Sequence, residues 1–461
     1  MSAPTSPIGK DSSFFYGWYI VAVSTLSLVV TNGLTIGGLP IFYEPLGNDL
    51  MARGVLTKET SAALFGFAPA ITFLVAGLFS PVAGALLKRV EIRILMTVGC
   101  VILGASLLLY SQAVVPSQIY LAHAGFGFSL AFAGVLINTV LVSNWFRKQR
   151  GKAVGITITG TSIGGVLIPT LAVPLIHNYG WRTGIVVLSL LVWFVLLPAI
   201  WLIVRVSPAQ MGLKPDGGAP NFDFDLQPQP AVEKNSELLA DTALNPLPGD
   251  EPPPAVVRDS PGETGMTLWQ ALATPLFWVL GLCAALIFYP IFATSQQFIL
   301  YLQRDLKFSN DTAAVVQALI FVASVGGKFG FGWLADKFPV SRVLLICCGL
   351  MFLGTLFLLS LNQTTAFLFL LPFGLGYGGT FVLLQLITAE SFGLRDIGRI
   401  LGVIIVIETF GGAIGNIITG QAAKAAGGNY AVAFNGVVIA TALAFVMSIL
   451  VNLLAKRKVV A

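Results

Sequence analysis

The segment Pro246-Leu247-Pro248-Gly249-Asp250-Glu251-Pro252-Pro253-Pro254 lies within a polar break, residues 207–266, that divides an otherwise apolar chain. The break holds 11 of the 25 prolines and ten of the 21 acidic residues. A segment of this composition cannot bury enough apolar surface to offset the entropy of ordering it. We therefore expect a disordered linker between two structured units.

Six apolar stretches precede the break and six follow it, and each is long enough to cross a bilayer. A hydrocarbon core about 30 Å thick requires about 20 residues per helix, and a helix satisfies its own backbone groups there. Only 10% of the residues are charged, whereas soluble domains carry about 25%. The predicted spans are 16–40, 60–86, 92–112, 117–144, 152–177, 182–206, 275–302, 311–335, 342–361, 365–391, 397–424 and 430–455.

The two sets of six spans repeat each other at an offset near 249 residues. Gly125-Phe126-Gly127-Phe128 recurs as Gly374-Leu375-Gly376-Tyr377. Such a duplication places a pathway on the axis between two halves. We predict an all-α membrane protein with two six-helix bundles related by pseudo-twofold symmetry. Its parts are an N-terminal tail (1–15), the first bundle (16–206), the linker (207–266), the second bundle (267–455) and a C-terminal tail (456–461).

Lysine and arginine are distributed unequally between the two sides of the predicted membrane. With both termini on one side, that side holds 19 of the 26 basic residues and the other side holds six. The positive-inside rule therefore places the tails and the linker in the cytoplasm. We expect a multi-pass protein of the plasma membrane, which is the inner membrane in a bacterium.

Several functional classes are disfavoured by the sequence. The basic residues are explained by membrane topology, so they do not indicate a nucleic-acid surface. Two histidines far apart, and four cysteines inside predicted spans, predict that the chain has no metal site. The chain has no phosphate-binding Gly-Lys-Ser/Thr loop and no nucleophile–histidine–acid set. We expect no enzyme activity and no cofactor, and we expect a monomer that works in the lipid bilayer.

The layout resembles the major facilitator superfamily over essentially the whole chain. Its local motifs resemble the branch of monocarboxylate transporters and bacterial oxalate:formate antiporters. The motifs that carry the resemblance are Tyr16-Gly17-Trp18-Tyr19-Ile20-Val21, Phe42-Tyr43-Glu44-Pro45-Leu46, 144–155 (NWFRKQRGKAVG), 211–217 (MGLKPDG), Thr274-Pro275-Leu276-Phe277-Trp278 and 332–342 (GWLADKFPVSR). The resemblance implies a secondary transporter that works by alternating access.

Two ionisable residues lie deep in predicted spans, where an unpaired charge costs several kcal/mol. Lys328 is eight residues before Asp336, and Glu408 is nine residues after Arg399. These separations place them about 12 Å and about 14 Å into their helices, at a rise of 1.5 Å per residue. The resemblance implies that Lys328 stands where relatives use an arginine to meet the substrate carboxylate. It also implies that Glu408 stands where oxalate-type members carry a lysine.

This pair of charges is unsuited to a dianion and favours a monoanion that moves with a proton, or a zwitterion. In the first case, binding of an anion to Lys328 would remove the influence of a neighbouring ammonium and favour protonation of Glu408. In the second, Lys328 would hold the acid group and Glu408 the amine of an amino acid or amino sulfonate. A permanent Lys328–Glu408 ion pair between the two helices is the structural alternative.

Further residues are predicted from their place in the spans. The substrate-binding candidates besides Lys328 are Asn32, Asn138, Tyr289, Gln296, Tyr377 and Gln385. His123 is a second candidate for proton coupling beside Glu408, because histidine titrates near neutral pH, although a packing role is the alternative. The gating candidates, implied by the resemblance, are Asp336, Arg342, Lys88 and Arg93, and Leu87 replaces the aspartate in the first copy of the motif.

The function predicted from these observations is proton-coupled symport of a small organic anion of the monocarboxylate type. The alternative substrate is a zwitterion. A membrane sensor derived from a transporter is the alternative from another class, although the linker shows no folded signalling domain.

Overall fold

The structure is a computed structural model that describes residues 15–87, 89–147, 149–217, 265–360, 362–393 and 395–460. The side chains of residues 456–460 are outside this description. The N-terminal tail before residue 15, residues 218–264 of the predicted linker and the gating candidate Lys88 lie outside the described residues.

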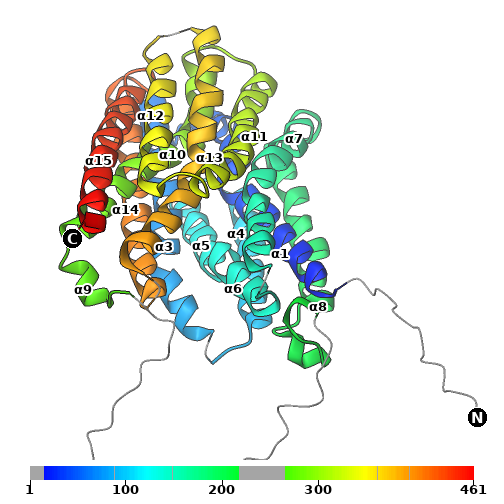
Figure 1. Cartoon of the computed structure of the whole chain (residues 1–461). Helices are drawn as coiled ribbons and strands as arrows, with labels where there is room; N and C mark the ends of the chain where they lie inside the picture. Colours follow the sequence, from blue (N-terminus) through cyan, green and yellow to red (C-terminus); the bar gives the residue numbers. More distant parts are fainter. Residues whose placement is uncertain are drawn as a thin grey trace, which may run out of the picture.

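The described chain is built from helices, and its one β-bridge is an isolated pair between Gly265 and Gly393 (Figure 1). The long helices are α1 (Gly17–Asn32, continued by a π-helical turn Gly33–Gly37), α3 (Lys58–Leu86), α4 (Ile92–Ser111), α5 (Pro116–Ala133), α6 (Val135–Trp145), α7 (Arg150–Leu190, continued by Leu191–Leu196 and α8, Leu197–Ile203), α10 (Pro275–Arg304), α11 (Asn310–Ala335), α12 (Val340–Leu356), α13 (Gln363–Phe392), α14 (Ile397–Ala425) and α15 (Phe434–Val460). Two short helices, α2 (Tyr43–Ala52) and α9 (Leu268–Leu272), lie outside the spans.

Among the described residues, 11 helical segments are long and apolar enough to cross a membrane. One of them, Arg150–Ile203, contains 54 residues, about 80 Å of helix at 1.5 Å per residue. Gly180 interrupts it with φ +78°, in the left-handed region that glycine occupies readily. The segment is therefore two spans joined by a sharp turn, which correspond to the predicted spans 152–177 and 182–206.

Side-chain caps set several of the helix starts. Thr57 accepts a hydrogen bond from the Thr60 amide at the start of α3, Ser309 caps α11, and Asn362 caps α13. Such caps satisfy backbone N–H groups that a helix leaves unpaired at its first turn. Between the ends, large apolar side chains such as Phe194 and Leu202 are more than 70% exposed. Exposure of this kind suits a lipid-facing surface.

The first helix and both ends of the described break lie on one face, which we call the linker face. The Tyr16 hydroxyl donates to the Ile203 carbonyl at 2.8 Å, so the start of α1 lies beside the end of α8. The Arg147 amide donates to Asp216 at 3.0 Å. In Figure 1 this face is the lower one, with α8 and α9. The other face, which carries α2 and the turn at Gly180, is called the opposite face.

The two halves meet mainly through two helix pairs, α3 with α14 and α7 with α11. Near the opposite face the first pair is very close, because a Cβ on Gly66 would lie 2.8 Å from the Gly420 Cα. Towards the linker face, a Cβ on Gly155 of α7 or Gly402 of α14 would meet no described atom within 4 Å. The halves are therefore packed together near the opposite face and separate towards the linker face.

Candidate functional site

Lys328 joins the two halves of the molecule. It lies on α11 of the second half and is 8% exposed. Its Nζ donates to the Thr161 hydroxyl at 2.7 Å, the Ser162 hydroxyl at 2.8 Å and the Ile158 carbonyl at 3.3 Å. All three acceptors belong to α7 of the first half. The three N–H donors of the ammonium are thus matched by three acceptors.

The hydrogen bonds around this ammonium have a defined direction. Ser324 has a single hydroxyl proton, which it donates to the Phe321 carbonyl at 2.8 Å. The Ser162 hydroxyl must then be the donor in its 2.8 Å contact with Ser324. Lys328 therefore donates to Ser162, Ser162 to Ser324, and Ser324 to the backbone. These bonds form a polar contact between α7 and α11 at mid-depth.

Aromatic rings form a layer next to this contact. The aromatic layer consists of Phe73, Phe288, Phe292, Phe321, Tyr377 and Phe381. Phe73 of the first half stacks on Phe292 of the second half, with centroids 3.7 Å apart. The Lys328 Nζ lies 5.9 Å from the centroid of Phe381. Gln385, one turn beyond Phe381 along α13, is exposed.

Glu408 lies on α14, at the other helix pair of the interface. It is 9% exposed, and it makes no hydrogen bond or ion pair to the described residues. Its neighbour Thr409 packs against the Gly77 position of α3, where a Cβ would approach it to 2.8 Å. One turn further along α14, Gly412 lies against Phe292 of the aromatic layer. Glu408 is therefore an unpaired carboxyl group in a largely buried position.

The predicted alternative of a Lys328–Glu408 ion pair is wrong for this conformation. The ion pairs among the described residues do not join these two side chains. The physical reason is the helix pairing, because α11 packs on α7 whereas α14 packs on α3. The idea that Lys328 acts on Glu408 as an immediate neighbour loses its basis for the same reason.

The other predicted substrate-binding residues fall into separate groups. Tyr377 is 8% exposed and belongs to the aromatic layer. Asn32 on α1 is 7% exposed, and its amide donates only a long bond of 3.4 Å to Thr31. Gln296 instead ties the halves together near the opposite face, because it accepts from the Tyr43 hydroxyl at 2.7 Å and donates to the Ile36 carbonyl at 3.2 Å.

Two predicted substrate-binding residues have packing contacts within a single half. Asn138 donates to the carbonyls of Ala133 and Gly134, at 2.8 and 2.9 Å, across the break between α5 and α6. Tyr289 packs against Gly415 and receives a 3.4 Å hydrogen bond from Thr419.

His123 is also enclosed within the first half. It is 1% exposed, and its Nδ1 lies 2.8 Å from the Thr72 hydroxyl. Tyr110 and Phe126 meet its ring edge-on. This environment favours the packing alternative over a role in proton coupling.

The three predicted gating residues that the structure describes do not connect the halves. Asp336 and Arg342 are exposed on the linker face, and their side chains make no hydrogen bond or ion pair within the described chain. Arg93 donates through Nε to the Val204 carbonyl at 3.1 Å, so it fixes the end of α8 to α4 within the first half. Separation of the halves on this face explains why Asp336 and Arg342 lack partners.

The sequence analysis did not predict a cluster that closes the opposite face. Arg304 of α10 donates to Glu44 of α2 at 2.7 Å and to Ser61 of α3 at 3.1 Å, and its side chain is only 3% exposed. Together with Tyr43 and Gln296, these residues form the opposite-face gate. The signal available in the sequence was the position of Glu44 within the family-like segment 42–46.

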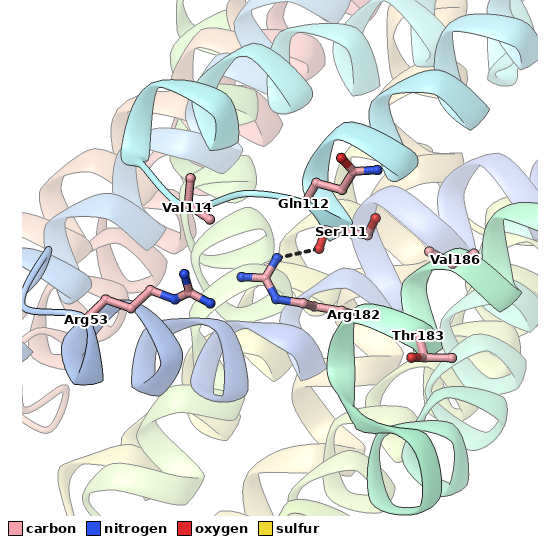
Figure 2. Close-up of a pocket in the computed structure, with 7 residues that line it drawn as sticks. All are labelled: Arg53, Ser111, Gln112, Val114, Arg182, Thr183 and Val186. Carbon is pink, nitrogen blue, oxygen red and sulfur yellow. Dashed lines mark hydrogen bonds between the residues drawn. The ribbon is translucent and has the colours of Figure 1, made fainter.

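A second charged group lies on the opposite face, beside a cavity of about 450 Å³ (Figure 2). Arg182 donates to the Ser111 carbonyl at 2.7 Å and to Asp49 at 2.7 Å. Arg53 also reaches Asp49, at 3.2 Å. Partial burial opposes ionisation of Asp49, but the hydrogen bonds from Arg182 and Arg53 hold the pKa of its carboxyl below the usual value. This group fastens α2 to the end of α4 and to the part of α7 that follows the turn at Gly180.

Comparison with known proteins identifies the family. The sequence profile described as "Major Facilitator Superfamily" matches residues 21–416 and 280–459. The chain belongs to this superfamily. It is a membrane transporter by family, with the predicted fold class, and it is not an enzyme.

The relatives within the superfamily are distant. Monocarboxylate transporter 12 of Rattus norvegicus is 24% identical over 85% of this chain and 76% of that protein. Membrane sensor protein UhpC of Salmonella typhimurium is 23% identical over 64% of this chain and 60% of that protein. A bacterial homologue of the human lysosomal transporter Spinster, solved in an inward-facing and unoccupied conformation, superposes with a TM-score of 0.62 at 16% identity, covering 97% of this chain and 98% of that one. This structural likeness shows the fold alone.

Proposed function

We propose that this protein is a secondary active transporter that carries a small organic monoanion of the monocarboxylate class together with a proton. The observation that carries the proposal is Lys328, a largely buried ammonium at the contact between the two halves. A carboxylate is the natural partner of such a group, because a buried charge is stable only when it is paired or hydrogen-bonded. The similarity to monocarboxylate transporter 12 supports this substrate class.

In this proposal, transport of the anion is coupled to transport of a proton because the two halves can close over the site only when both are bound. Glu408 lies on the α3–α14 pair and Lys328 on the α7–α11 pair, so each charge belongs to a different part of the interface. Closure towards the linker face would remove water from both, and an uncompensated charge opposes that step. A proton on Glu408 and an anion on Lys328 together remove this cost.

In this proposal access alternates between the two faces. The opposite-face gate closes one face here, and Asp336, Arg342 and Arg93 lie at helix ends that would approach the other half when the linker face closes. We place the linker face in the cytoplasm because most of the basic residues lie on that side. The protein then resides in the plasma membrane, or the inner membrane of a bacterium, and works as a monomer.

The test is transport by purified protein in liposomes, with radiolabelled benzoate and lactate as probes and an imposed pH gradient. Wild-type protein is expected to accumulate at least one of these carboxylates when the gradient is present. Lys328→Met should abolish uptake and exchange. Glu408→Gln should lose gradient-driven accumulation but keep carboxylate exchange, because its uncharged amide mimics the protonated acid. Unimpaired, gradient-driven accumulation by Glu408→Gln contradicts the coupling.

The same assay includes matched control variants and distinguishes the zwitterion and sensor alternatives. Lys424→Met and Glu390→Gln change exposed residues of the same types and should behave as wild type. Accumulation of taurine rather than carboxylates, with both Lys328 and Glu408 required, would establish the zwitterion alternative. Binding without any transport would establish a sensor, the function named for the relative UhpC.

A further inference from the structure

We propose that Thr161 and Ser162 form, with Lys328, a single carboxylate site shared by the two halves, and that its ligand is a monocarboxylate with a flat apolar body. This inference rests on the proposed function and specifies the ligand of the same site. It assigns a binding role to the hydroxyl groups of α7, which the sequence analysis did not single out.

The first step is the chemistry of the three polar groups. In this structure both hydroxyls accept from the ammonium, and each donates its own proton elsewhere, Thr161 to the Ile158 carbonyl at 2.9 Å and Ser162 to Ser324. A hydroxyl can rotate to donate as well as accept. When a carboxylate enters between α7 and α11, Lys328 donates to it from one half while Thr161 and Ser162 turn to donate to it from the other.

The Ile158 carbonyl is the third acceptor of the ammonium, and the distances indicate that it is not part of the proposed carboxylate site. The Lys328 bond to Ile158 is the longest of the three, at 3.3 Å, compared with 2.7 and 2.8 Å to the hydroxyls. A carbonyl cannot donate, so Ile158 has no role opposite an anion. The carboxylate therefore replaces Ile158 as a partner of the ammonium, and the two hydroxyls stay in the site.

The second step is the charge. Lys328 is the one lysine or arginine deep within a predicted span, and Glu408, on the other helix pair, adds no positive charge. The ammonium can neutralise one carboxylate, and the two hydroxyls can donate hydrogen bonds to it. A second carboxylate would enter a largely buried region that holds no cation to compensate its charge, which is unfavourable. The site therefore selects monoanions.

The third step is the wall beside the ammonium. The Phe381 ring lies 5.9 Å from Nζ, and Tyr377 and Phe321 follow it edge-on, with centroids 5.5 and 5.9 Å apart. Phe381 and Thr161 are partly exposed, so both sides of the site are reachable. A flat ring bound to the carboxylate would lie against these rings and gain aromatic contacts in addition to the burial of its apolar area.

Equilibrium binding to the purified full-length protein tests the site, with benzoate, acetate and benzyl alcohol as probes. Wild type should bind benzoate at least tenfold more tightly than acetate, and it should not bind benzyl alcohol. The variant Thr161→Val with Ser162→Ala should raise the benzoate Kd by about tenfold or more, because hydrogen bonds to a charged group are strong. Thr161→Ser should retain wild-type affinity, as should Thr170→Val, which alters a hydroxyl bonded only within α7.

The sign of the change in Kd decides between a binding role and a structural one. If the hydroxyls served only to hold the lysine in this conformation, their removal would free the ammonium and lower the benzoate Kd. A lower or unchanged Kd, with binding still dependent on Lys328, overturns the shared site and leaves the proposed function intact. Equal affinity for acetate and benzoate overturns the apolar body. The absence of any binding that depends on Lys328 overturns the proposed function itself.

Discussion

Lys328 illustrates why a lysine suits this position better than an arginine. Its three donors meet two hydroxyls and one carbonyl on α7. A guanidinium has five donors in a planar fork, which match a carboxylate in two parallel bonds but would leave donors unpaired against this set. A compact ammonium can therefore be satisfied both by the other half and by a ligand, which is what a site between two moving halves requires.

Asn138 provides a test that separates packing from substrate contact. Its amide bridges the α5–α6 break, and removing it leaves the carbonyls of Ala133 and Gly134 without that donor in the membrane interior. We expect Asn138→Ala to lower the free energy of unfolding by about 1–3 kcal/mol. The benzoate Kd should not change. Thermal unfolding and equilibrium binding measure the two effects, and a weaker Kd at unchanged stability would return Asn138 to the substrate site.

Asp49 should make a pH-dependent contribution to stability. Its pKa is lowered in the folded protein, so the contribution is present above the unfolded pKa and is lost as the pH falls through the folded value. The Asp49→Asn variant is expected to be less stable near neutral pH, by no more than about 1 kcal/mol because the pair is partly exposed. Thermal unfolding over a pH series should show the two proteins converge in acid. A constant difference at every pH contradicts this role.

For single residues, the sequence predicts how deep each side chain lies in the membrane. It does not predict which neighbouring helix the side chain faces. The spacings to Asp336 and Arg399 placed Lys328 and Glu408 in the interior of their helices, and both are at least nine-tenths buried. Their separation onto different helix pairs depends on how each helix is rotated and which neighbour it meets. The helical rise per residue converts sequence spacing into depth, but a single sequence does not show which helices pack against each other. For the same reason the sequence does not show that His123 and Tyr289 make packing contacts within one half.

The glycines of α7 and α14 suit the two conformations that the proposed transport cycle needs. Each helix carries a pair near the linker face, Gly151 with Gly155 and Gly398 with Gly402, where no described atom lies within 4 Å of a built Cβ. Deeper in the membrane each carries packed glycines, such as Gly164, which lies against α1. The glycines that repeat in the sequence are therefore also packed alike in the two halves, open near the linker face and in contact deeper in the membrane.

We expect the unpacked glycines to become contact surfaces when the linker face closes, because glycines allow helices to approach closely in a membrane. Gly155→Leu and Gly402→Leu should then keep the linker face open. Transport is expected to fall by more than about tenfold, whereas the benzoate Kd should stay within about threefold of wild type, since the open form already binds. Uptake and binding assays measure both quantities. Thr170→Leu, which adds bulk to an exposed position of α7, is the control.

Irregular helical segments were the elements that the sequence predicted least well. The predicted span 117–144 is two helices, because the backbone at Gly134 is extended and Asn138 bridges the gap. The predicted span 16–40 ends in a π-helical turn from Gly33 to Gly37. Hydropathy registers an apolar run whether or not the helix within it is continuous. The interruption is determined by local hydrogen bonds that a composition average does not contain.

At the scale of the whole molecule, the proposed transport cycle needs two conformations, and the structure shows one of them. The opposite-face gate is closed, and Asp336 and Arg342 on the linker face have no ion-pair partner among the described residues. Conformations of this kind differ by only a few kcal/mol, so small changes at either face shift the balance. The superfamily fold could be predicted from the spans and the repeat, but the state could not, since the same residues serve both.

The Glu44–Arg304 contact should set that balance. Glu44→Gln leaves a buried guanidinium with Ser61 and a neutral amide, and Arg304 Nη1 already lacks a partner among the described residues. Breaking a buried pair costs 3–5 kcal/mol, and we expect about 2 kcal/mol here because Glu44 is 25% exposed. Opposite-face-open protein should then increase by about 30-fold.

The readout is the rate at which a membrane-impermeant maleimide, added from the opposite face, labels a Thr35→Cys reporter. Thr35 is 2% exposed behind the gate, and the four native cysteines are buried. The rate should rise with Glu44→Gln and return towards wild type when Glu44→Arg is combined with Arg304→Glu, because the exchange restores a pair of opposite charges across the halves. An unchanged rate in Glu44→Gln would show that the glycine contacts between α3 and α14 hold this face closed without the ion pair.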